Sequence, residues 1–222
     1  QLLVLADERV PRFGEDTDEG RLVERIERSE HRQSADELGD HAEIEQIVAG
    51  DVAEQLAELP LREDAPLRPV SPYAASKIAA DFLGLQAWLG YQLEVIRVRA
   101  FNRLGPGQTN RFVAPALAER IALNELEGRE VVPVGNLTPR RDFTDVRDVV
   151  RAYRLLVERG EPGEAYNVCS GVDIAISELA DRLVAMATRP MRLEEDPALQ
   201  RPVDVPVLRG DANKLHKATN WV

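Results

Sequence analysis

Tyr73 and Lys77 are the two residues whose types and spacing most directly indicate acid–base chemistry. They stand four positions apart, so a helix would place both side chains on one face. An ammonium beside a phenol favours the phenolate, and we expect Lys77 to lower the pKa of Tyr73 from its usual value of about 10. Such a tyrosine can exchange a proton with a carbonyl or carbinol oxygen. The pair taken alone is also compatible with chance placement.

The segments around this pair extend the pattern. They are Pro69–Lys77, Arg97–Gln108, Gly135–Asp148, Tyr166–Gly171 and Arg201–Pro206. In order and spacing they resemble the landmarks of the extended short-chain dehydrogenase/reductase (NAD-dependent epimerase/dehydratase) family, over residues 61–221. Within that family the resemblance is nearest to the GDP-4-keto-6-deoxy-D-mannose reductases and the GDP-mannose 4,6-dehydratases.

The resemblance implies a site. Tyr73 would be the catalytic acid and Lys77 would tune it, and both would contact NADP or NAD together with Ala100. The implied contacts to a GDP-sugar substrate are Asn102, Phe112, Val113, Arg141 and Arg201. The two arginines would hold the diphosphate or the guanine, because a guanidinium fork suits such groups. Without the motif, the alternative for either arginine is a surface ion pair.

The implied reaction is reduction of the 4-keto group of a GDP-6-deoxyhexose with a nicotinamide cofactor. The alternative within the family is dehydration of GDP-mannose, which needs an acidic residue beside a Ser or Thr; Asp51 is the one candidate. An alternative of another class is an inactive remnant that still binds a sugar nucleotide. A loop that binds the nicotinamide cofactor would distinguish the enzyme from the remnant.

Two departures from the family pattern bear on activity. Family members carry a G-x-x-G-x-x-G loop well before the tyrosine, and residues 1–72 contain no such spacing. Ala49 stands where the family has a Ser or Thr hydroxyl. Because backbone amides of the glycine loop receive the cofactor pyrophosphate, we expect this chain to bind the cofactor weakly and to be impaired as a reductase. The sequence does not choose between NADP and NAD.

The predicted elements alternate between strands and helices, which favours an α/β fold with a parallel sheet. The predicted helices span Tyr73–Leu89, Phe112–Glu127, Arg147–Arg159 and Ser177–Thr188. We expect Ser71 and Ser177 to cap the first and last helix, and Pro72 to stand at the first helical position. The predicted strands are Glu94–Ala100, Val131–Val134 and Ala165–Val168.

Gly105, Pro106 and Gly107 resemble the start of a dinucleotide-binding loop. Pro106 has no N–H to offer a phosphate, and Asn110 stands where a third glycine would be needed. We therefore predict an ordinary turn here. Cys169 lies in an apolar segment and is predicted to be a core thiol.

The domain prediction follows the change in composition along the chain. Residues 1–58 form an atypical acidic segment that does not match the family, and residues 1–60 carry the whole net charge of -11. Residues 59–110 are predicted to be the C-terminal part of a Rossmann-like domain that is incomplete at its N-terminus. Residues 111–222 are predicted to be mainly a small substrate-binding domain. We expect the acidic segment to supply at most one strand, at Leu2–Leu5 or at Ile44–Val48.

The composition of the chain limits the classes of partner that we expect it to bind. An acidic chain is a poor candidate for binding nucleic acid. No apolar run reaches the roughly 18 residues that a membrane helix needs. The single cysteine fits a reducing cytoplasm, and His31, His41 and His216 lack the spacing of a metal site. The family resemblance further implies a homodimer through the helix that carries Tyr73 and Lys77.

Overall fold

The computed structural model describes residues 2–4, 59–69, 71–200 and 205–222. In chain order the helices and strands are β1 (Leu2–Val4), α2 (Pro72–Tyr91), β2 (Val95–Ala100), β3 (Asn102–Leu104), α3 (Val113–Glu127), β4 (Val131–Val134), β5 (Arg140–Asp145), α4 (Val146–Arg159), β6 (Ala165–Val168), β7 (Asp173–Ala175), α5 (Ile176–Val184), β8 (Arg192–Glu195), η1 (Pro197–Leu199), β9 (Val207–Leu208) and α6 (Asn213–Thr219). No helix in these ranges is long and apolar enough to cross a membrane.

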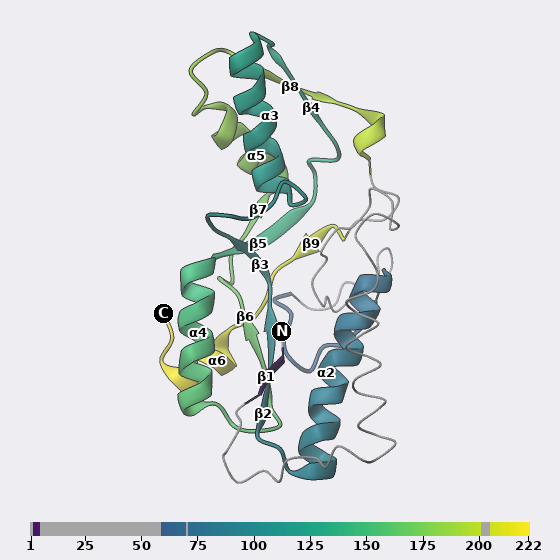
Figure 1. The fold of residues 1–222 in the computed structure, drawn as a ribbon, viewed down its shortest axis with the longest axis vertical. Helices are drawn as coiled ribbons and strands as arrows, with labels where there is room; N and C mark the ends of the chain where they lie inside the picture. The colour runs from purple at the N-terminus through teal and green to yellow at the C-terminus, as the bar shows by residue number, and fades with distance from the viewer. Residues whose placement is uncertain (1, 5–58, 70, 201–204) are drawn as a thin grey trace, which may run out of the picture. The chain divides into compact units, whose positions relative to one another are not determined.

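The strands form three small sheets. The first has the order β1-β2-β6, with β2 and β6 parallel and β1 antiparallel. The second joins β3, β5 and β7, and β9 also pairs with β5; the third is the parallel pair of β4 and β8. Helix α2 lies on one side of the first sheet and α4 with α6 on the other (Figure 1). The α/β class with parallel strands is therefore confirmed.

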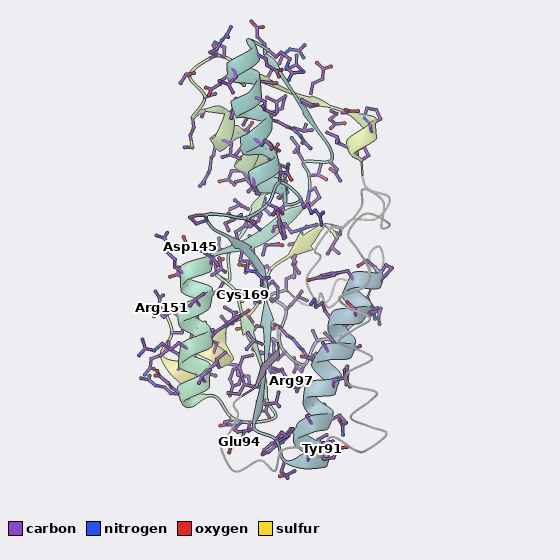
Figure 2. The ribbon with its side chains drawn as sticks, viewed as in Figure 1. Tyr91, Glu94, Arg97, Asp145, Arg151 and Cys169 are labelled. Carbon is purple, nitrogen blue, oxygen red and sulfur yellow. The ribbon has the colours of Figure 1, made fainter. Side chains whose placement is uncertain are left out.

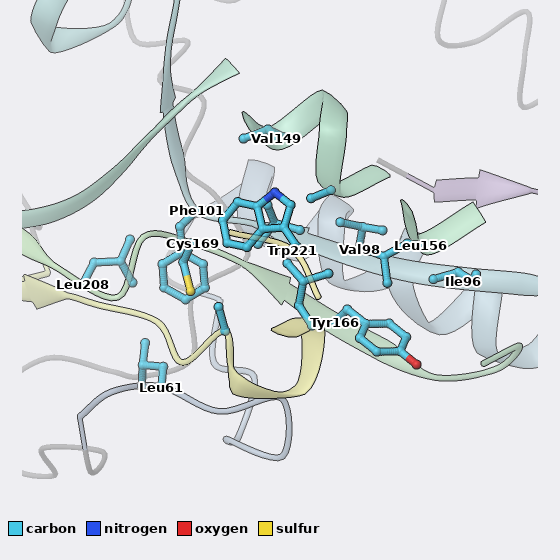
Figure 3. Packing of buried hydrophobic residues seen from close by; sticks show 14 residues of the cluster. Leu61, Ile96, Val98, Phe101, Val149, Leu156, Tyr166, Cys169, Leu208 and Trp221 are labelled. Atoms are coloured by element: carbon cyan, nitrogen blue, oxygen red, sulfur yellow. The ribbon is translucent and has the colours of Figure 1, made fainter. Parts of the chain in front are cut away.

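Two apolar clusters hold these layers. The first fills the space between β2, α4, β6 and α6, and includes Ile96, Val98, Leu156, Tyr166 and Trp221 (Figure 3). A large apolar side chain that is fully buried contributes about 1.5–3 kcal/mol to folding. The second cluster joins α3, β4 and α5 through Leu117, Ile121, Val132, Val134 and Ala180. The first cluster combines residues from both sides of position 110. The predicted domain division at that position remains a prediction.

Most helix ends follow the local sequence. Ser71 is the N-cap of α2 and accepts a hydrogen bond from the Ala74 N–H at 3.1 Å, and proline stands at the first helical position, as predicted. Helix α3 ends at Gly128, whose φ of 72° favours glycine, and α4 ends at Gly160. One strand, β1, lies at the first of the two places predicted for the acidic segment. The predictions for residues 5–58, including Ala49 and Asp51, lie outside the described residues.

The predicted cap at Ser177 is wrong. Strand β7 runs directly into α5, so the extended Ala175 is the N-cap, and the Ser177 N–H donates instead to the Leu137 carbonyl at 2.9 Å. The helix also ends at Val184 rather than at Thr188. Beyond it the backbone continues in tighter turns, in which the N–H groups of Met186 and Ala187 each bond three residues back.

The Gly105–Gly107 segment is a turn, as predicted, and Gly107 has a φ of 82°. Gly105 is required for another reason: a Cβ at this position would lie 2.2 Å from a Val146 methyl carbon. The glycine therefore lets the turn approach the start of α4.

Candidate active site

The first two turns of α2 carry Tyr73 and Lys77. The Lys77 ammonium lies over the Tyr73 ring, 5.2 Å from its centroid, so the two side chains share one helix face. That geometry agrees with the predicted i, i+4 arrangement. Both side chains are partly exposed, and so they remain accessible to a ligand.

The electrostatics of Tyr73 differ from the prediction. Its pKa is raised, chiefly because burial disfavours the phenolate, and the positive charge of Arg103 opposes the shift. Lys77 does not lower it as expected, and its ammonium lies over the face of the ring. Arg103 is thus a residue of the site that the sequence reasoning missed, although it directly follows Asn102.

Strands β2 and β3 carry Ala100 and Asn102, respectively. Ala100 is the last residue of β2 and pairs with Val168, and Asn102 opens β3 opposite Phe143 of β5. The Nδ2 group of Asn102 is buried and has no hydrogen-bond partner. Leaving such a donor unpaired costs about 1–3 kcal/mol, which makes the amide a candidate for a ligand contact. The predicted contact between Asn102 and the substrate remains a prediction.

Arg141 lies on β5, two positions before the residue that pairs with Asn102. Its guanidinium donates to the Val205 carbonyl at 2.6 Å and to the Arg140 carbonyl at 3.0 Å. The first contact ties β5 to the residue that follows segment 201–204. Arg201 itself lies outside the described residues.

Asp142, next to Arg141, is fully buried and anchors the loops around it. One carboxylate oxygen accepts from the Ser170 N–H at 2.8 Å and from the Ser170 hydroxyl at 2.6 Å. The other accepts from the N–H groups of Gly171 at 2.9 Å and Gly210 at 3.3 Å. This aspartate therefore fixes the strand that presents Arg141.

Phe112 and Val113 begin α3, with Phe112 as an N-cap that lacks a side-chain hydrogen bond. Both are half-buried, and Val113 packs against the second apolar cluster. The structure gives Val113 a packing role, and the substrate role of both residues remains a prediction.

Two further polar groups near Arg103 escaped the sequence reasoning. Thr144 pairs with Arg103 in the β3–β5 register, and its buried hydroxyl has no partner. The Tyr153 hydroxyl on α4 is also buried and unpaired. Burial raises the pKa of Tyr153, and the charge of Arg103 again opposes the shift. No local sequence pattern marks these residues, because only the pairing of β3 with β5 and the packing of α4 bring them to Arg103.

A cavity of about 470 Å³ lies elsewhere, between the 62–63 segment and α6. Its lining includes Arg62, Glu63, Glu161, Asp211 and Lys214, and none of the predicted site residues. Cys169 is buried, as predicted, and burial followed by the charge of Asp142 raises the pKa of its thiol. This thiol is a core group rather than a nucleophile.

Comparisons with known proteins identify the family and relatives of this chain. The sequence model of the GDP-mannose 4,6 dehydratase family matches residues 48–222. GDP-6-deoxy-D-mannose reductase of Pseudomonas aeruginosa is 40% identical over 179 residues, which are 79% of this chain and 59% of that protein. GDP-mannose 4,6-dehydratase of Sinorhizobium fredii is 27% identical over 183 residues, 74% of this chain and 52% of that protein.

Solved structures give the same result. RMD from Pseudomonas aeruginosa, complexed with NADPH, has a TM-score of 0.71 at 39% identity, covering 78% of this chain and 57% of that one. The dTDP-glucose 4,6-dehydratase from Bacillus anthracis, in complex with NAD, has a TM-score of 0.64 at 26% identity, covering 78% and 53%. The chain thus spans about half to three fifths of the length of these relatives. The resemblance to extended short-chain dehydrogenases is confirmed, and the chain belongs to the GDP-mannose 4,6 dehydratase family.

Proposed function

We propose that this chain is the catalytic-tyrosine and substrate-binding part of an NAD(P)-dependent reductase that acts on the 4-keto group of a GDP-6-deoxyhexose. The observation that supports this most is the 40% identity to a GDP-6-deoxy-D-mannose reductase, against 27% to a GDP-mannose dehydratase. Since the chain spans 59% of that reductase, the activity of the whole enzyme is part of the proposal.

Tyr73 has the properties of the acid in such a reduction. Its phenol is protonated at neutral pH and can transfer that proton to the substrate oxygen as the ketone becomes an alcohol. Burial raises the pKa of this phenol and so opposes the transfer, and the charge of Arg103 acts in the favourable direction. The phenolate that remains is stabilised by the charge of Arg103. Lys77 holds the ring through its contact with the aromatic face.

The residues present fit a nicotinamide cofactor. Tyr73, Lys77 and Ala100 would contact it: Tyr73 and Lys77 share one partly exposed face of α2, and Ala100 is the last residue of β2. When bound, the nicotinamide supplies the hydride. The Pseudomonas aeruginosa relative is complexed with NADPH and the Bacillus anthracis relative with NAD, so we keep both cofactors in the proposal.

For the substrate, we assign Asn102 to the sugar and Arg141 with Arg201 to the diphosphate or the guanine. Asn102 and Arg141 lie on adjacent paired strands, which supports a single ligand reaching both. We further assign Phe112 and Val113, at the start of α3, to the substrate side of the site.

GDP-mannose dehydration is the second candidate, because the matching family model carries that description. The residues that would decide it, Ala49 and Asp51, lie outside the described residues. The third candidate, a remnant that binds a sugar nucleotide without hydride transfer, keeps the Asn102 and Arg141 contacts and lacks the cofactor.

We also propose that the chain pairs through α2. Large apolar side chains of this helix are exposed, namely Phe82, Leu83, Leu89 and Tyr91. Exposed apolar patches of this kind commonly mark interfaces. A cytoplasmic setting remains our proposal, supported by the single, buried and free Cys169.

Calorimetric titration tests the substrate class. We expect GDP-mannose to bind and dTDP-glucose to bind at least about tenfold more weakly, a difference of roughly 1.4 kcal/mol. Arg141→Ala should weaken GDP-mannose binding, whereas Arg154→Ala, on the exposed face of α4, should leave it unchanged. Equal binding of both nucleotide sugars, or of neither, would contradict the proposal.

A further inference from the structure

Asp81 is a buried carboxylate in the middle of the helix that carries Tyr73 and Lys77. It is 6% exposed and bonds two arginines of the neighbouring strand. Its Oδ2 accepts from Arg97 Nη1 and from Arg99 Nη2, each at 2.9 Å, and its Oδ1 accepts from Arg99 Nε at 3.3 Å. Arg97 (Figure 2) and Arg99 lie two positions apart on β2 and both bond Asp81, so both side chains point toward α2.

The far sides of the two guanidinium groups are also fixed. Arg97 donates twice to the Gly163 carbonyl, at 3.2 and 3.1 Å, and Arg99 donates to the Glu63 carbonyl at 2.8 Å. The Trp88 ring lies against Gly163, where a Cβ would come within 2.2 Å of it. The Asp81 cluster, meaning Asp81, Arg97 and Arg99, therefore connects α2 to β2 and to two loops.

Burying the Asp81 cluster costs more free energy than apolar packing would need to hold α2 in place. Burying three charges carries a desolvation penalty, and apolar side chains of similar volume often give equal or better stability. Charged hydrogen bonds instead restrict geometry. Three bonds to one carboxylate allow α2 to rotate or shift along β2 only slightly. A function that depends on the orientation of α2 would account for this arrangement.

We propose that Asp81 is a positioning residue for Tyr73 and Lys77. Residues 73, 77 and 81 are spaced by four, so they follow one side of α2, and about 12 Å of helix separates Tyr73 from Asp81. The strand that carries Arg97 and Arg99 ends at Ala100, and Asn102 opens the next strand, β3, two residues later. The Asp81 cluster thus sets the distance between the acid on the helix and the ligand-facing end of the strand. This role rests on the proposed function of Tyr73.

The test uses the full chain with carbon-13-labelled tyrosine. It measures how far Arg103→Ala raises the pKa of Tyr73, because Arg103 lies on β3 and Tyr73 on α2. With 4 tyrosines in the chain, the Tyr73 signal can be assigned with Tyr73→Phe. The two variants are Arg99→Lys, which keeps the charge but loses the fork, and Asp81→Asn.

Arg99→Lys should reduce this effect of Arg103→Ala to about half or less, because a lysine cannot reproduce the paired contacts to Asp81 and Glu63 that hold α2 against β2. Leu156→Ala, which opens a cavity in the first cluster beside α4, provides a variant with lowered stability and an intact Asp81 cluster. An undiminished effect of Arg103→Ala in the Arg99→Lys background, or an equal loss of that effect in the Leu156→Ala background, would overturn the positioning role.

The proposed function has a separate readout. Calorimetric titration of the wild-type chain with GDP-mannose reports on ligand binding, and failure to bind would count against the proposed function. The Tyr73 pKa is measured without ligand, so it decides the role of the Asp81 cluster in either case. If Asp81→Asn does not fold, Arg99→Lys decides alone, because it retains every charge of the cluster.

Discussion

The ammonium of Lys77 lies 5.2 Å from the centroid of the Tyr73 ring. At this distance it contributes a cation–π attraction of about 0.5–1 kcal/mol at an exposed site. This contact orders the ring, while burial governs the proton on the hydroxyl. The acid and its neighbour are therefore coupled through orientation in the free protein.

Tyr73 should ionise at a higher pH in the folded chain than in the unfolded chain. Burial favours the neutral phenol, so the associated stability is present below the unfolded pKa of about 10 and is lost as the pH rises through the folded pKa. Carbon-13 spectra of labelled tyrosine across pH measure this directly. Arg103→Ala should raise the pKa of Tyr73 further, and Arg111→Ala, an exposed control, should not change it. A Tyr73 pKa below 10 would show that the environment acts in the opposite sense.

Asp142→Asn should destabilise the chain by about 3 kcal/mol, because an amide replaces a carboxylate oxygen that accepts buried N–H donors. Urea unfolding followed by circular dichroism measures the change. Asp64→Asn removes an aspartate from an exposed ion pair with Arg62 and should cost less than about 0.5 kcal/mol. Similar costs for the two variants would mean that the buried contacts contribute little.

Cys169 should resist thiol reagents in the native chain. Its side chain is fully buried and its pKa is raised, so the reactive thiolate is scarce. Colorimetric thiol titration at pH 8 should show one thiol that reacts only when denaturant is added. Rapid modification of the native chain would contradict the burial of this residue.

The 222-residue polypeptide should bind NADPH weakly. Its sequence has no G-x-x-G-x-x-G segment to place backbone amides around the pyrophosphate. Fluorescence titration with NADPH is the measurement, with GDP-mannose as the comparison ligand. Saturation at micromolar NADPH would show that other residues supply the phosphate contacts.

The helices were predictable because their ends carry local signals. Ser71 with Pro72, Gly128 and Gly160 mark boundaries that the structure reproduces to within a few residues. The strands β3, β5, β7, β8 and β9 were missed. Strands β3, β7 and β9 have only two or three residues each and exist through pairing with β5, and β5 and β8 consist largely of charged residues. Strand pairing between distant segments leaves little trace in short, charged sequences.

The site was predictable only in part. Tyr73, Lys77, Asn102 and Arg141 belong to recognisable segments, and the structure brings the first two together and places the last two on adjacent strands. The influence of Arg103 on Tyr73 depends on how β3 meets α2. No spacing rule encodes a contact of that kind, and the same holds for the bonds of Asp81 to β2.

The most direct measurement uses a chimera in which residues 48–222 follow the corresponding N-terminal part of the Pseudomonas aeruginosa reductase. That part supplies the glycine loop expected of the family, and NADPH absorbance reports the reduction of GDP-4-keto-6-deoxymannose. If Tyr73 is the acid of a GDP-sugar reductase, the chimera turns over at about 1 per second, an ordinary rate for enzymes. Tyr73→Phe then lowers the rate by about a hundredfold or more. A chimera that folds and binds NADPH but does not reduce this substrate, or that works equally well with Tyr73→Phe, would contradict the assignment.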